Sequence, residues 1–160
     1  MLSTLVPIVA VAGGLFVLWQ AALRWRAFGT DQVRAIVAEA RTTFYDITAR
    51  GELDRSEFQT GDRHTVDARL QDLHGQLHDR VLQDRVDHLL THVRSAWASA
   101  PEKWFGVAWV SAESSARVTS DSPERQAQVQ RQVEAARAGL VEVDSVIERC
   151  NQLDRLIVRP

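Results

Sequence analysis

Four of the five histidines lie within one 19-residue stretch, and their spacing could hold a metal ion. His74 and His78 form one i,i+4 pair, and His88 and His92 form another. On a helix, each pair would place two imidazoles on one face, where they could bind zinc, and Asp84 could add a carboxylate one turn before His88. The pairs are roughly 21 Å apart along a helix, so they could form two half-sites but not one site. No HExxH or ExxH pattern supplies further ligands, and an ordinary solvated face is the alternative to a metal-binding or pH-sensitive one.

The remaining reactive residue types do not form a catalytic pattern. Cys150 is the only cysteine, so no intrachain disulfide is possible, and its place among apolar residues predicts a buried, inert thiol. The chain has no glycine-rich phosphate loop and no nucleophile elbow. We therefore predict a protein that is not an enzyme, has no cofactor and has no small-molecule substrate.

The charges are balanced and scattered. The chain has 19 basic and 21 acidic residues, with a net charge of −2. Non-specific binding of nucleic acid needs a clustered basic patch, and the arginines here are interleaved with acids. The composition therefore argues against a nucleic-acid partner.

A charge-free aromatic run, 104–110, lies in the second half of the chain. It contains Trp104, Phe105 and Trp109, which are unfavourable in an exposed loop. Three interpretations are open: the run closes the core at the tip of a helical hairpin, it contacts the membrane surface, or it binds a partner.

The first 23 residues are the most distinctive part of the sequence. Residues 2–23 are uncharged and, as a helix, would be roughly 33 Å long, enough to cross a hydrocarbon layer of about 30 Å. Trp19, Trp25, Arg24 and Arg26 lie at the C-terminal end of this segment, where interfacial aromatic and basic residues are common. We predict a single transmembrane anchor with its flank over 1–28, which contacts the lipid bilayer through residues 2–23.

The arginines predict the orientation of this anchor. Arg24, Arg26 and Arg34 follow the apolar segment, and no basic side chain precedes it. The positive-inside rule then places the N-terminus outside the cell membrane and the rest of this single-pass protein in the cytoplasm.

Two helices are predicted in the first half of the remaining chain. An amphipathic helix over 31–50, capped by Asp31 and ended by Gly51, is followed by a polar connector, so that 29–61 forms one unit. A second helix is predicted over 62–98. Its apolar positions change face after Gly75, which indicates a kink or two halves with different neighbours. The two stripes of this helix are Val66, Leu70, Leu73 and Leu77, then Leu82, Val86, Leu89, Val93 and Trp97.

The last predicted helix begins at Pro123, with Ser122 as its cap, and runs to about Ile157. It carries a heptad seam, which could pack within the chain or pair with another chain. The seam consists of Val129, Val133, Ala136, Leu140, Val143, Ile147 and Cys150.

Together these patterns predict an all-α protein in which a transmembrane helix precedes a three-helix domain. The domain would be built on a long, coiled-coil-like antiparallel hairpin over 62–160, with the Trp-rich connection at 101–122. The expected role is a non-catalytic membrane-anchored tether, scaffold or assembly subunit, with a protein partner or self-association through the helical domain. The alternative is a metal- or pH-responsive membrane-bound sensor that uses the histidine-rich face.

Overall fold

Every regular element in the described part of the chain is a helix, which confirms the all-α prediction. The computed structural model describes residues 5–58, 65–101 and 122–157, with no side chains described for 5–14. The helices are α1 (Leu5–Arg26), α2 (Thr30–Arg50), α3 (Arg55–Phe58), α4 (Val66–His74), α5 (Arg80–Ala98) and α6 (Pro123–Leu156).

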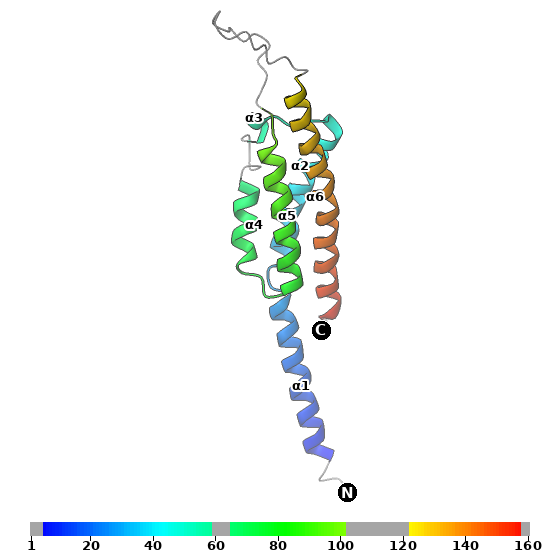
Figure 1. The fold of residues 1–160 in the computed structure, drawn as a ribbon. Helices are drawn as coiled ribbons and strands as arrows, with labels where there is room; N and C mark the ends of the chain where they lie inside the picture. The colour runs from blue at the N-terminus through cyan, green and yellow to red at the C-terminus, as the bar shows by residue number, and fades with distance from the viewer. Residues whose placement is uncertain (1–4, 59–64, 102–121, 158–160) are drawn as a thin grey trace, which may run out of the picture.

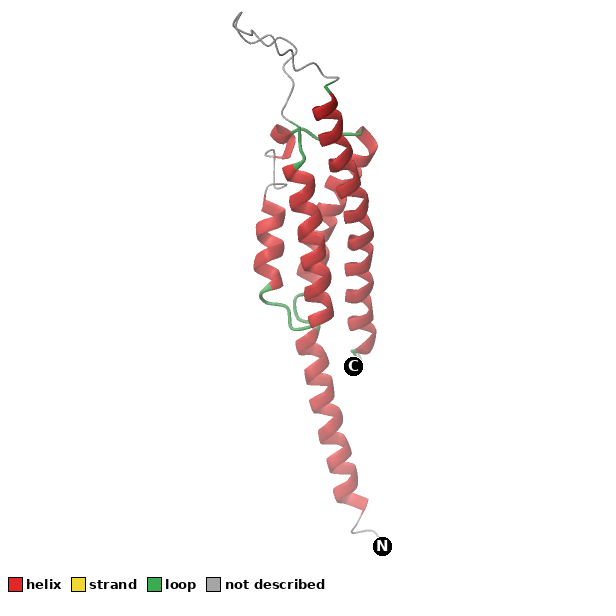
Figure 2. Cartoon of the chain, in the orientation of Figure 1, coloured by secondary structure: helices red, strands yellow, loops and turns green. Residues whose placement is uncertain are grey.

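Helices α2, α4, α5 and α6 form an up-down-up-down bundle (Figure 1). α6 packs against α5 and α2, and α4 packs against the same two helices. α1 extends away from one end of this bundle, as the blue helix in Figure 1 and the lowest red helix in Figure 2. We call this end, formed by residues 23–31, 75–81 and 149–156, the base.

The core lies along the whole length of the bundle and receives large apolar side chains from all four helices. Phe44 and Ile47 of α2, Leu70 of α4, and Leu82 and Leu89 of α5 are essentially inaccessible to solvent. Burial of each such side chain stabilises the fold by about 1.5–3 kcal/mol. Packing of amphipathic faces therefore provides most of the stability of the helices.

The prediction of one helix over 62–98, and with it of a three-helix domain, is wrong. The chain leaves α4 at His74, reverses direction and re-enters a helix at Arg80, so the described part of the domain has four main helices. Asp79 takes extended backbone angles, and its carboxylate accepts the Leu82 N–H at 2.9 Å, which caps α5. The change of apolar face after Gly75 thus marks a turn between antiparallel helices.

The start of α2 also differs from the prediction. α2 begins at Thr30 after Gly29, and Asp31 makes an ion pair with Arg34 (2.9 Å) instead of capping the helix. Gly29 has a φ of +85°, a conformation that favours glycine. The predicted end of α2 at Gly51 is confirmed, because the Gly51 N–H donates to the Ile47 carbonyl at 2.9 Å.

The predicted start of α6 is confirmed. The Ser122 hydroxyl accepts the Arg125 N–H at 3.2 Å, and Pro123 opens the helix. The predicted seam is fully buried at Ala136, Val143 and Cys150, and Val133, Leu140 and Ile147 are partly buried against the core. The second buried column of α6 is shifted by one residue from the prediction and consists of Gln132, Gly139, Val146 and Leu153.

Gln132 is a fully buried polar side chain that connects three parts of the bundle. Its Nε2 donates to the Leu53 carbonyl at 2.8 Å and to the Ala96 carbonyl at 3.4 Å. Its Oε1 accepts the Leu53 N–H at 3.0 Å. The side chain of α6 thus satisfies the backbone of the connector after α2, which would otherwise be buried without partners.

Gly139 allows α6 to approach α2 closely. A Cβ at this position would lie 3.0 Å from Cδ2 of Phe44 and closer still to Cε2 and Cζ of the same ring. Phe44 is itself buried, so the ring has little room to move away. The aromatic side chain of α2 therefore occupies the space that a larger residue at 139 would need.

We predict that Gly139→Ala lowers the stability of the protein by about 1–3 kcal/mol, because overpacking against Phe44 outweighs the gain of about 1 kcal/mol in helix propensity. Thermal unfolding followed by circular dichroism measures the change. Phe44→Leu in the Gly139→Ala background should recover part of the loss, whereas a Gly139→Ala protein that melts above the wild type would contradict the close contact.

Candidate functional site

Apart from Gln20, the described side chains of α1 before Arg24 are apolar, and most of them are exposed. Leu15, Val17 and Leu18 are 63%, 65% and 68% exposed, and Phe16 and Trp19 are about half exposed. α1 meets the bundle only near its C-terminal end, where Leu23 is buried. A soluble helix normally has one polar face, and this one has none before Arg24.

Within residues 5–58, 65–101 and 122–157, the structure contains no helix with the length and apolar character needed to cross a bilayer. The predicted span, 2–23, includes residues 2–4, which lie outside the described residues, and 5–14, whose side chains are not described. The transmembrane helix therefore stays a prediction.

A buried carboxylate joins α1 to the bundle. Asp79 is fully buried at the base and binds Nε and Nη2 of Arg149 at 3.0 and 2.8 Å. Nη2 of Arg26, at the end of α1, donates to the same carboxylate at 2.8 Å. With the Leu82 N–H, Asp79 thus contacts α1, α5 and α6 at once.

The pKa of Asp79 lies below the usual value for an aspartate. Burial opposes ionisation, but the hydrogen bonds from Arg149, Leu82 and Arg26, together with the charge of Arg149, favour the carboxylate more strongly. Asp79 also holds the pKa of Arg149 above its usual value. Asp79 and Arg149 therefore both stay charged at neutral pH.

Aromatic contacts reinforce the same junction. His78 lies against Trp25, with ring centroids 3.9 Å apart, and its ring centroid is 6.0 Å from that of Phe28. At Gly29 a Cβ would lie 3.4 Å from Cδ2 of Leu77, so the turn between α1 and α2 packs directly on the turn between α4 and α5. The junction between α1 and the bundle is therefore tightly packed.

The structure separates one of the predicted histidine pairs and keeps the other, His88 and His92, on one helix. His74 is the last residue of α4, whereas His78 lies in the following turn, so the two do not share a helix. His88, His92 and Asp84 lie on α5. Among the described residues no three His, Cys, Asp or Glu side chains are grouped as metal ligands would be.

The aromatic run and Cys150 are the remaining predicted sites. Trp104, Phe105 and Trp109 lie outside the described residues, so their interpretation stays open. Cys150 is fully buried, as predicted, and burial raises the pKa of its thiol to about 11. A thiol with such a pKa is a poor nucleophile at neutral pH.

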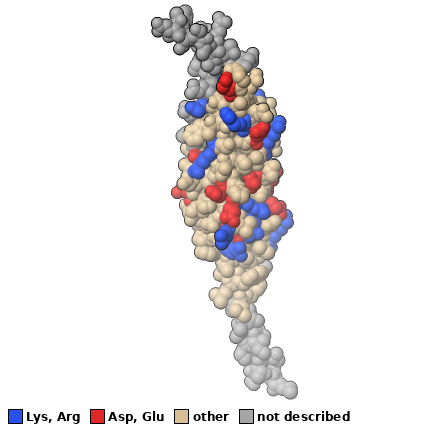
Figure 3. Space-filling model, in the orientation of Figure 1, with Lys and Arg blue, Asp and Glu red and all other residues tan. Residues whose placement is uncertain are grey.

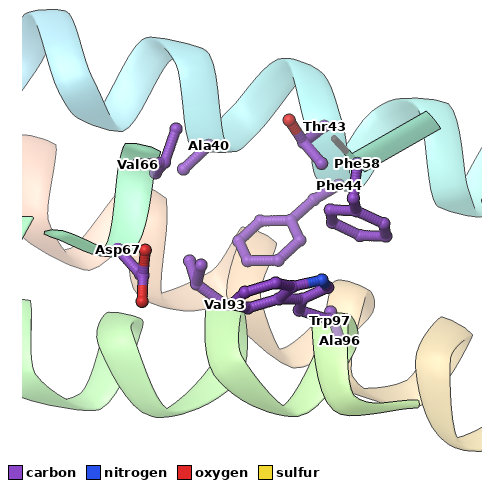
Figure 4. Close-up of a pocket in the computed structure, with 9 residues that line it drawn as sticks. All are labelled: Ala40, Thr43, Phe44, Phe58, Val66, Asp67, Val93, Ala96 and Trp97. Carbon is purple, nitrogen blue, oxygen red and sulfur yellow. The ribbon is translucent and has the colours of Figure 1, made fainter. Parts of the chain in front are cut away.

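A small apolar cavity lies between α2, α4 and α5 (Figure 4). The rings of Phe44, Phe58 and Trp97 lie together at one end of it, and Asp67 lies at the other. Its volume is about 20 Å³, which is room for roughly one water molecule. This cavity is too small for a ligand.

The sequence did not identify the cluster around Asp79. One signal was available in the sequence. Asp79 lies three residues before Leu82, the first residue of an apolar stripe, and an aspartate in this place is typical of a helix cap. Its two arginine partners are 53 and 70 residues away, and nothing in a single sequence pairs residues over such separations.

No known protein-family model, curated protein or solved structure matches this chain.

We predict that Asp79→Asn destabilises the protein at pH 7 by about 3 kcal/mol, because it leaves Arg149 with no charge partner. The pKa of Asp79 is lowered on folding, so its contribution is present above the pKa of the unfolded state and is lost as the pH falls through the folded value. The difference between wild type and variant should therefore shrink below about pH 4. Urea unfolding over a pH series measures both effects.

Asp144→Asn is the matched control. Asp144 pairs with Arg41 at 3.2 Å, but both side chains are substantially exposed. Such surface pairs contribute about 0–1 kcal/mol, so this variant should stay close to the wild type. Equal losses for the two variants would contradict the special role of Asp79.

Proposed function

We propose that this protein is a non-catalytic membrane-anchored scaffold or tether, in which α1 is the anchor and the four-helix bundle binds a protein partner or another copy. The observation that carries the proposal is that α1 extends from the bundle with apolar side chains exposed on all sides. An exposed apolar surface of this kind marks a site of contact with lipid or protein.

The flanks of α1 and the uncharged sequence before its described side chains support lipid as the contact. Its described side chains, from Leu15 to Arg26, account for roughly 18 Å of helix. Residues 2–14 are uncharged in the sequence and would supply the rest of a span. Trp19 and Trp25, with Arg24 and Arg26, are residue types suited to the boundary between hydrocarbon and headgroups.

The proposed orientation follows from the same arginines. Arg24, Arg26 and Arg34 all come after the apolar segment, and the positive-inside rule then places the bundle in the cytoplasm. The non-catalytic part of the proposal is supported by the sequence, which has no recognised catalytic motif.

We predict that Leu15→Arg with Leu18→Arg releases the protein from membranes, because an arginine costs about 2.5–3.5 kcal/mol on insertion at the centre of a span and less nearer its ends, where Leu18 lies. Both side chains are exposed, so the bundle should still fold. The measurement is the fraction of full-length protein that stays in the membrane pellet after alkaline carbonate washing, with bundle folding checked by circular dichroism.

Val141→Arg is the control for this variant. Val141 is 68% exposed on α6, as exposed as Leu18, but lies on the bundle. It should leave the pelleted fraction unchanged. A wild-type protein that carbonate removes would contradict the anchor, and an export-dependent reporter active at the C-terminus would contradict the cytoplasmic orientation.

A further inference from the structure

The exposed large apolar side chains gather at one end of the molecule. Apart from Leu15–Trp19 on α1, the described residues of this kind include Trp25, Phe28, Val81 and Leu156. These four come from four different segments, and all lie at the base, around the exit of α1. Only three lie elsewhere: Tyr45, Trp97 and Val141.

The aspartates at the base are already occupied. Asp79 is bound by Arg26 and Arg149. Arg34 binds both other aspartates, Asp31 at 2.9 Å and Asp154 at 2.5 Å. These ion pairs leave no carboxylate at the base for the remaining arginines.

Three exposed arginines at the base have no ion-pair or hydrogen-bond partner among the described residues. Arg24 is in the last turn of α1, Arg80 opens α5, and Arg155 is in the last turn of α6. Asp84 lies one turn along α5 from Arg80, within reach of it, but the two side chains form no ion pair. In Figure 3, basic side chains lie at the lower end of the bundle, directly above the uncharged surface of α1.

We propose that the base binds the headgroups of anionic phospholipids through Arg24, Arg80 and Arg155. Guanidinium groups bind phosphate oxygens through paired N–H donors, and each arginine near an anionic bilayer adds to binding. The apolar side chains between them, Trp25 and Phe28 above all, are suited to the interface beside the headgroups. This inference rests on the proposed anchor, which would bring the base to the membrane surface.

The test uses full-length protein and vesicles of phosphatidylcholine alone or of phosphatidylcholine with phosphatidylglycerol. The readout is the partition coefficient at low and high salt. Arg80→Gln with Arg155→Gln is the test variant, because both arginines are outside α1 and unpaired, so the anchor and the ion pairs stay intact. Arg131→Gln with Arg137→Gln is the control, because it removes the same charge from exposed positions of α6 far from the base.

We expect wild-type protein to partition more strongly into the anionic vesicles, with a gain that high salt reduces. For the Arg80/Arg155 variant, the partition coefficient into anionic vesicles should fall about fivefold for each arginine removed. The Arg131/Arg137 variant should keep the gain of the wild type. Equal losses for both variants would overturn the inference, because net charge alone would then explain the binding.

Two further outcomes distinguish failure of the headgroup site from failure of the membrane anchor. Equal partition of the wild type into both kinds of vesicle would overturn the headgroup site and leave the anchor intact. No partition into either would overturn both proposals.

Discussion

The buried carboxylate of Asp79 is the interaction on which the arrangement of the helices depends most. An ionised group without solvent is strongly destabilising unless cations and N–H donors surround it. Here the Leu82 N–H, Arg149 and Arg26 meet this need, and they belong to α5, α6 and α1. The charge is satisfied only when the three elements converge. Other packings of the same apolar helices would leave it unpaired, so the cluster favours one arrangement over its alternatives.

A neutral counterpart stabilises the opposite half of the bundle. Gln132 binds both backbone groups of Leu53 and the carbonyl of Ala96, so α6 is fixed to the connector after α2 and to the end of α5. Between Gln132 and Asp79 the core contacts are mainly apolar, and the Phe44 ring packed on Gly139 sets how closely α2 and α6 approach. The polar contacts of Gln132 and of Asp79 thus define how the helices align along the bundle. The apolar contacts between these two levels provide most of the stability.

The helical class and several helix ends could be predicted, because they follow from local patterns such as Ser122 before Pro123. The number of helices could not, because the change of apolar face after Gly75 is compatible with both a kink and a reversal. The buried column of α6 was displaced by one position, since Gln132 and Gly139 do not appear apolar in a sequence. Their burial depends on Leu53 and Phe44, which are remote in the chain. The ion pairs of Asp79 are likewise long-range, so the composition of the base was not foreseeable from one sequence.

The turn between α1 and α2 has a mechanical consequence. Only residues 27–29 separate the two helices, and backbone hydrogen bonds continue through them, including Ala27 N–H to the Leu23 carbonyl at 2.9 Å. Such a turn fixes the direction of α1 relative to the bundle and does not act as a flexible hinge. α6 is roughly 51 Å long, so a bundle held at a bilayer by α1 would place its far end about 50 Å from the headgroups. The protein would then act as a rigid spacer that fixes the height at which a partner meets the membrane.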